Sequence, residues 1–212
     1  MSRIFGYGED AFTLWALRHR KSEFLKEFQD KTSPSDCLVF YRPSFGRSGE
    51  KISAQFGEFD AILISSENIY LIESKWDNFS RNRNDAITLE PCQELRHPIL
   101  LWYILHWDEK YSKNWGSFVK EKRENFKKEF TGRRLAPTGS LLATNLEFIL
   151  TATQKHFGRV PSKQNVKNVL LFFYDKDKST PPANLPKGFS LVAIDYSKEI
   201  TGNFIYLDNL AD

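Results

Sequence analysis

The chain has 212 residues, of which 41% are hydrophobic and 27% are charged, values that are typical of one well-packed globular domain and exclude a low-complexity or disordered chain. The net charge of +3 is too small to identify a partner. The longest apolar stretch, residues 99–105, is too short to span a bilayer, and the first residues lack the apolar core of a signal peptide. We therefore expect an intracellular, cytoplasmic protein without a membrane partner.

The first part of the chain predicts a helix followed by three strands. Leu14, Leu17 and Phe28 recur at helical spacing and lie opposite a charged face. Two apolar runs then flank a turn signal at residues 66–68, which predicts a hairpin. The expected elements are a helix at 9–30 and strands at 37–41, 56–65 and 68–76.

The rest of the chain predicts three helices and two more strands. Pro91 occupies a first-turn position that tolerates proline, and Pro98 predicts a kink in the same helix. The expected helices span 91–107, 117–130 and 140–156, and the expected strands span 166–174 and 189–196. This order predicts an α/β fold with a mixed central sheet flanked by helices.

Three ionisable residues interrupt the two apolar runs of the hairpin: Asp60, Glu73 and Lys75. A buried charge costs several kcal/mol unless it has a partner, a metal or a solvated edge, so three charges here need an explanation. Because side chains alternate along a strand, Glu73 and Lys75 project from the same face. Pairing of the two runs as a hairpin brings Asp60 near Glu73, whereas a one-residue slip would send Asp60 to the other face.

These residue types suit the hydrolysis of a phosphodiester bond. Carboxylates such as Asp60 and Glu73 are hard oxygen ligands that suit Mg²⁺, with Mn²⁺ as an alternative, and Lys75 can place a positive charge on the phosphate. The alternative is that a Glu-x-Lys tripeptide lies on a solvated strand face and serves only solubility. That alternative fits poorly here because both faces of the strand are apolar.

The pattern of one Asp, a hairpin and Glu-x-Lys resembles the PD-(D/E)xK nuclease superfamily, with Phe59 where the name-giving proline would stand. The resemblance implies a restriction-endonuclease-like αβββαβ core and catalytic roles for Asp60, Glu73 and Lys75. Residues 1–212 would then form one nuclease domain, with its core at about 9–107 and 166–196 and a helical elaboration at about 108–160.

Two further site residues follow from the same resemblance. Glu9 matches a glutamate at the start of the first helix that joins the metal ligands in many members, although an acidic residue in a first helical turn is also common without such a role. Gln93 matches a glutamine on the following helix that helps to orient the site, and an ordinary surface glutamine is the alternative.

Basic residues around the motif are candidates for nucleic-acid binding. Arg and Asn side chains both donate hydrogen bonds to phosphate oxygens, and a solvated loop is the alternative for residues 81–84. The candidates are Arg47, Lys51, Arg81, Arg83, Arg133 and Arg134.

The leading functional hypothesis is a Mg²⁺-dependent deoxyribonuclease that acts as an endonuclease, of restriction type or of repair and recombination type. The alternative is a non-catalytic nucleic-acid-binding or assembly protein that retains the nuclease fold. RNA remains open as a substrate. Double-strand cleavage would lead us to expect a homodimer, since one active site faces one strand.

Overall fold

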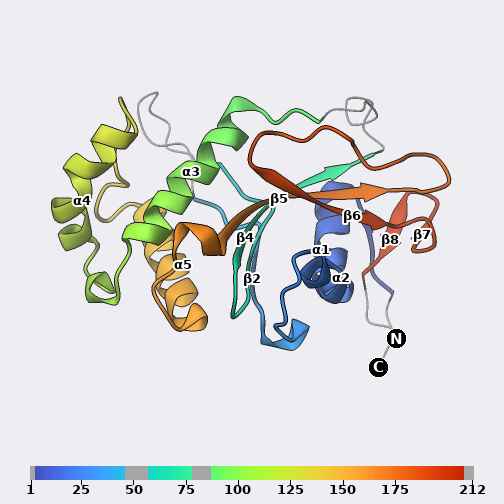
Figure 1. Ribbon diagram of the computed structural model, residues 1–212, viewed down its shortest axis with the longest axis horizontal. Coiled ribbons are helices and arrows are strands. Elements are labelled where there is room, and N and C mark those ends of the chain that lie inside the picture. Colours follow the sequence, from blue (N-terminus) through green and yellow to red (C-terminus); the bar gives the residue numbers. More distant parts are fainter. Residues whose placement is uncertain (1–2, 46–56, 78–86, 208–212) are drawn as a thin grey trace.

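The structure is built around a five-stranded mixed sheet in the order β2-β3-β4-β5-β6 (Figure 1). It is a computed structural model that describes residues 3–45, 57–77 and 87–207. Neighbouring strands are antiparallel from β2 to β4 and parallel from β4 to β6. The strands are β2 (Leu38–Tyr41), β3 (Ala61–Ile64), β4 (Ile69–Trp76), β5 (Val166–Tyr174) and β6 (Phe189–Asp195).

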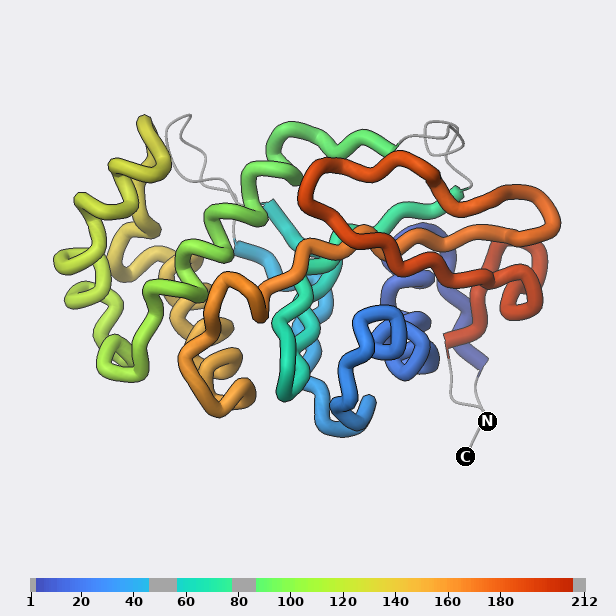
Figure 2. Tube along the Cα trace, in the orientation of Figure 1, coloured from blue at the N-terminus to red at the C-terminus, as the bar shows by residue number. Residues whose placement is uncertain are grey.

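Helices cover both faces of this sheet (Figure 2). Two N-terminal helices pack on one face, and three later helices lie on the opposite side, with the longest crossover running from β4 to the parallel strand β5. The predicted α/β class with a mixed central sheet flanked by helices is confirmed. The helices are α1 (Glu9–His19), α2 (Lys21–Glu27), α3 (Pro91–His106), α4 (Trp115–Glu129) and α5 (Leu141–Phe157).

Strand β4 shows why the sheet is buried on both sides. Ile69 and Leu71 join the core formed with α3, α4 and α5, while Tyr70 and Ile72 join the core formed with α1 and α2. Alternate side chains of one strand therefore supply two separate hydrophobic cores, as expected for a central strand. The helices predicted as an elaboration, α4 and α5, share their core with β3 and β4.

The caps of the later helices explain where they begin. Glu90 and Gln93 form a capping box at the start of α3, with Pro91 in the first turn. The side chains of Asn114 and Ser140 accept backbone N–H groups at the starts of α4 and α5. These helices and the strands β4, β5 and β6 begin and end within two residues of the predicted bounds.

The predicted single helix at 9–30 is wrong in one respect, because it is divided into α1 and α2. Arg20 leaves the helical conformation with φ −124° and ψ 15°. Its guanidinium bonds to Glu23 and Glu199 and lies over the Trp15 ring. The turn at Arg20 lets α2 bury Phe24 against the same core as α1, although no proline or glycine marks the break in the sequence.

Two other predictions need correction. The predicted strand at 56–65 is shorter, because Glu58 makes only an isolated bridge to Ser44, Asp60 is a bend, and Gly57 has a positive φ of 68°. A small second sheet was not predicted, since its strands are only two or three residues long. It consists of β1 (Phe5–Tyr7), β8 (Phe204–Tyr206) and β7 (Ile200–Thr201).

Three short 3₁₀ helices complete the described structure: η1 (Pro34–Asp36), η3 (Glu109–Tyr111) and η4 (Lys163–Asn165). Within residues 3–45, 57–77 and 87–207, none of the helices combines the length and the apolar character that crossing a bilayer requires.

Candidate active site

Asp60 lies just before β3, in the part of the hairpin that faces the C-terminal half of β4. Ala61 pairs with Ile72, so the same register places Asp60 opposite Glu73. The backbone N–H of Ser74 donates to Asp60 Oδ2 over 2.7 Å. Burial and the charge of Glu73 raise the pKa of Asp60 to about 7, although the Ser74 hydrogen bond and Lys75 act in the opposite direction. The predicted hairpin therefore does bring Asp60 to Glu73.

Glu73 is fully buried and receives hydrogen bonds from one helix. Arg96 Nε donates to Oε1 over 2.5 Å, and the second guanidinium arm of Arg96 pairs with Oε2. His97 Nε2 lies 3.1 Å from Oε1, and Gln93 Nε2 donates to Oε2 over 3.2 Å. A carboxylate has about four acceptor positions, of which Arg96 and Gln93 donate to three, and His97 Nε2 lies at the fourth.

Helix α3 presents these three partners because of their spacing. Gln93, Arg96 and His97 are three and four residues apart, which places them on one face of a helix. Gln93 also accepts the Glu90 backbone N–H over 3.0 Å, so the cap of α3 fixes the amide that reaches Glu73. His97 Nδ1 lies 2.8 Å from Asn168 on β5, which fixes the ring from its other side.

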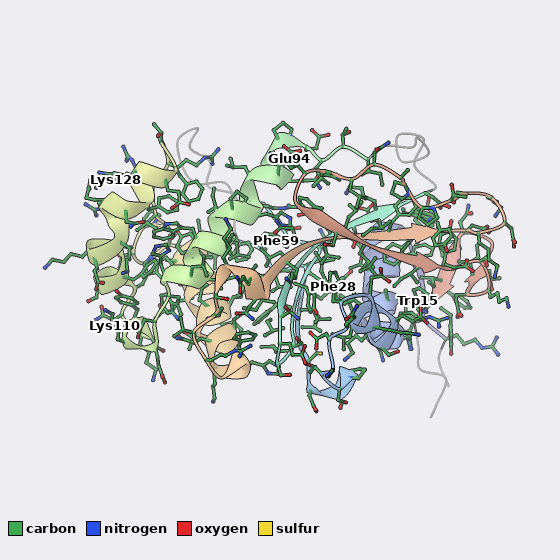
Figure 3. The ribbon with its side chains drawn as sticks, viewed as in Figure 1. Trp15, Phe28, Phe59, Glu94, Lys110 and Lys128 are labelled. Carbon is green, nitrogen blue, oxygen red and sulfur yellow. The ribbon has the colours of Figure 1, made fainter. Side chains whose placement is uncertain are left out.

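Phe59 supports this cluster with an apolar ring. It is fully buried and meets the His97 ring edge-on at 4.9 Å. The guanidinium of Arg96 lies 5.1 Å from the centroid of the Phe59 ring, within cation–π range. In Figure 3 the Phe59 label lies beside α3, close to the central sheet. The residue before Asp60 thus positions Arg96 and His97.

Lys75 reaches the first helix from the end of β4. Its ammonium lies 3.5 Å from Glu9 Oε1 and donates to the Ser74 carbonyl over 2.7 Å. Glu9 Oε2 accepts the Trp76 backbone N–H over 3.1 Å, and burial raises the pKa of Glu9 against the opposing effect of Lys75. Gly8, at φ 86°, makes the sharp entry into α1 that places Glu9 there.

The carboxylate oxygens of Asp60 and Glu73 are the type of ligand that a divalent cation prefers. Within the described ranges, no three His, Cys, Asp or Glu residues are grouped closely enough to hold a metal ion, so the predicted ligand set of Asp60, Glu73 and Glu9 is not assembled. Mg²⁺ needs only one or two carboxylates when water and a substrate phosphate complete its coordination. A metal at Glu73 would have to displace one of the donors from α3.

The predicted nucleic-acid contacts are only partly covered by the structure. Arg47, Lys51, Arg81 and Arg83 lie outside the described residues. Arg133 and Arg134 follow α4, which lies at the end of the molecule beyond α3 (Figure 1). In the part of the chain that the structure describes, no hydrogen bond or ion pair links these two arginines to Glu73 or Lys75.

Sequence reasoning missed Arg96, the residue that dominates the surroundings of Glu73. The signal that could have found it is the spacing of Gln93, Arg96 and His97 on a helix whose other residues are mainly apolar. It also missed the buried pair of Thr13 and Ser74, whose hydroxyls lie 2.7 Å apart between α1 and β4.

Comparisons with models of protein families, with curated proteins and with solved structures found no match.

Proposed function

We propose that this protein is a Mg²⁺-dependent endonuclease that hydrolyses phosphodiester bonds in DNA. The observation that carries the proposal is the convergence of Asp60, Glu73 and Lys75 at one end of β4, with Asp60 held by the Ser74 N–H. Lys75 supports the proposal because its ammonium, bonded to the Ser74 carbonyl, lies next to the residue whose N–H holds Asp60.

The proposed roles follow from what each residue can contact. Asp60 and Glu73 would hold Mg²⁺, which as a Lewis acid polarises the phosphoryl oxygen and activates water. Lys75 supplies a compact positive charge for a non-bridging phosphate oxygen. Glu9 orients that ammonium from α1, 3.5 Å away. Gln93, Arg96 and His97 orient the Glu73 carboxylate and therefore act as positioning residues.

The first test is DNA cleavage with and without the metal. Purified protein incubated with supercoiled plasmid and Mg²⁺ should nick or cut it, and EDTA should stop the reaction. Asp60→Ala, Glu73→Ala and Lys75→Ala should each abolish cleavage, with folding checked by circular dichroism. Full activity in folded Asp60→Ala protein would refute the assignment.

The site of cleavage separates the two types of endonuclease. Cutting at one defined sequence would indicate restriction, and cutting at branches or flaps would indicate repair.

One observation favours a second candidate, a non-catalytic protein that binds nucleic acid through the same fold. Arg96 and Gln93 on α3 donate three hydrogen bonds to Glu73, so Glu73 already has structural partners. Calorimetry separates the two functions. Absence of divalent-ion binding together with retained affinity for nucleic acid would favour the non-catalytic protein, whereas stoichiometric Mg²⁺ or Mn²⁺ binding that is lost in Asp60→Ala would favour the nuclease.

A further inference from the structure

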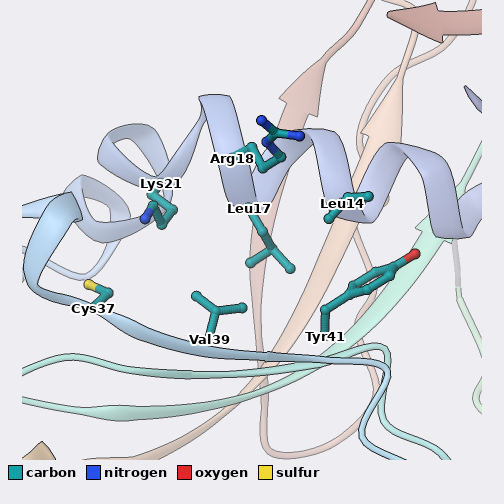
Figure 4. Close-up of a pocket in the computed structure, with 7 residues that line it drawn as sticks. All are labelled: Leu14, Leu17, Arg18, Lys21, Cys37, Val39 and Tyr41. Carbon is teal, nitrogen blue, oxygen red and sulfur yellow. The ribbon is translucent and has the colours of Figure 1, made fainter. Parts of the chain in front are cut away.

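A groove lies between helix α1 and the edge strand β2, outside the candidate active site. Its volume is about 420 Å³, which is within the range of small ligand sites. Figure 4 shows Leu17 pointing from α1 toward Val39 on β2, with Tyr41 farther along the same strand. The groove is lined by Leu14, Leu17, Arg18, Lys21, Cys37, Val39 and Tyr41.

One end of this groove adjoins the candidate active site. Tyr41 pairs with Ala61, the residue after Asp60, and the charge of Asp60 acts on the Tyr41 hydroxyl. The same hydroxyl donates to the Asp10 carbonyl over 2.8 Å, next to Glu9 on α1. A ligand that lies in the groove at Tyr41 therefore lies next to the strand position that pairs beside Asp60.

The chemistry of the groove combines positive charge with an apolar floor. Arg18 lies in the last turn of α1 and Lys21 begins α2, and in the described residues no ion pair neutralises Lys21. Leu17 and Val39 provide apolar surface between α1 and β2, and Tyr41 adds an aromatic ring. Cations along one wall and an apolar, aromatic floor are the features that bind a nucleic-acid strand through its phosphates and bases.

The edge of the sheet adds backbone donors to this surface. The backbone N–H of Arg42 donates to the Asp60 carbonyl, and in an antiparallel pair every second residue bonds to the neighbouring strand. The backbone N–H and C=O groups of Val39 and Tyr41 therefore point away from β3. In the described structure β2 is the last strand of its sheet, and no strand pairs with that edge. Backbone N–H groups at such an edge can donate to phosphate oxygens.

Acidic residues at the active-site end of the groove are paired. Arg42 forms ion pairs with both Asp10 and Glu58. These pairs lower the local negative charge that a phosphate would meet between Tyr41 and Asp60.

We propose that this groove binds one single strand of nucleic acid that extends from the active site, with its phosphates at Arg18 and Lys21 and its bases against Leu17, Val39 and Tyr41. The inference rests on the proposed function, because that function supplies the phosphodiester at the Tyr41 end. From Tyr41 to Cys37 the edge strand runs about 13 Å, enough for about two nucleotides. A passage bordered by one helix and one strand suits a single extended chain better than a duplex.

The test measures binding of a fluorescent oligothymidine of about 10 nucleotides to the full chain in EDTA, so that no cleavage occurs. The groove variant is Arg18→Gln/Lys21→Gln. The control is Lys120→Gln/Arg123→Gln, which removes the same two residue types at the same spacing from the exposed face of α4. The groove variant should bind the oligonucleotide about tenfold more weakly than the wild type. The slope of log K against log salt concentration should also be shallower by about 1.4, because each single-strand phosphate contact contributes about 0.7 to that slope. The control should bind like the wild type.

A second readout uses the two cysteines, which form no disulfide. In a Cys92→Ser background, the oligonucleotide should slow alkylation of Cys37, which lies at the far end of the groove. Equal binding by the groove and control variants, or unprotected Cys37 at saturating oligonucleotide, would overturn the inference. The inference would also be overturned if substitution of Arg18 and Lys21 weakened the binding of an acidic peptide but did not weaken the binding of the oligonucleotide.

The plasmid assay keeps this inference separate from the proposed function. Mg²⁺-dependent cleavage together with a groove variant that binds normally would overturn only the groove. Absence of cleavage together with groove-dependent strand binding would overturn the nuclease and support the groove as a nucleic-acid site.

Discussion

The buried carboxylate of Glu73 dominates the energetics at the residue scale. Glu73 is 0% exposed and Arg96 is 6% exposed, so both charges are removed from water. Such a pair is stable only when good geometry and extra hydrogen bonds offset the cost of desolvation. Gln93, His97 and the Glu58 carbonyl, which accepts from Arg96, provide those bonds.

Arg96→Met is therefore expected to destabilise the protein by about 3–5 kcal/mol, because it leaves Glu73 buried without its counter-ion. Urea unfolding of the metal-free protein measures the change. The double variant Glu73→Gln/Arg96→Met should lose less stability than Arg96→Met alone, since no unpaired charge remains. A loss below about 1 kcal/mol in Arg96→Met would mean that the pair is not formed as described.

Asp60 gives the metal-free protein a specific pH dependence. Its folded pKa of about 7 lies above the ordinary value of 3.8, so the folded state binds more protons than the unfolded state between these values. The stability contribution of protonated Asp60 is complete below about pH 3.8 and is lost as the pH rises toward 7. Asp60→Asn should therefore be more stable than the wild type at pH 8, and the difference should shrink on acidification to pH 5. Thermal unfolding at both pH values in EDTA measures this, and equal melting temperatures at pH 8 would contradict it.

At the scale of elements, the β3–β4 hairpin decides whether the candidate site forms, because its register places Asp60 opposite Glu73. A buried polar cluster fixes the turn of this hairpin. Asp30, after α2, accepts hydrogen bonds from Ser65 over 2.6 Å, from Tyr70 over 2.7 Å and from Asn68 over 3.1 Å. The site therefore depends on a contact at the opposite end of the strands.

Asp30→Asn should destabilise the protein by about 1.5–3 kcal/mol, since hydrogen bonds to a charged acceptor are the stronger kind. Burial opposes ionisation, but the bonds from Ser65, Tyr70 and Thr32 lower the pKa of Asp30 to about 2. This stability is present above about pH 3.8 and is lost as the pH falls toward 2. Denaturant unfolding at pH 7 of Asp30→Asn and of the exposed control Asp36→Asn measures the effect, and equal losses in both would contradict it.

Alternation and spacing made much of this arrangement predictable from the sequence. The turn at residues 66–68 and the apolar runs predicted the hairpin. The period of two predicted that Glu73 projects from one face of β4 and that Tyr70 and Ile72 project from the other face. The break at Arg20 was not predictable, because partners distant in sequence, such as Glu199, stabilise it. Arg96 was missed for the same reason: its partner is a residue on another element, and helical periodicity does not report such a contact.

At the scale of the whole molecule, the central sheet brings segments distant in sequence together at one place. The first helix supplies Glu9, the hairpin supplies Asp60, Glu73 and Lys75, and α3 supplies Gln93. The order of the larger elements was predictable because each has a long periodic pattern. The small sheet of β1, β7 and β8 was not, since strands of two or three residues carry too few positions to show a period.

We propose that the carboxylates of Asp60 and Glu73 support metal-dependent cleavage of DNA. The most direct test of this role is the single-turnover rate of DNA cleavage in Mg²⁺ at pH 8 for the wild type, Asp60→Asn and the exposed control Asp36→Asn. We expect the wild type and Asp36→Asn to cleave at equal rates, and Asp60→Asn to be slower by about 100-fold or more while remaining folded. Cleavage by Asp60→Asn at the wild-type rate would contradict the account.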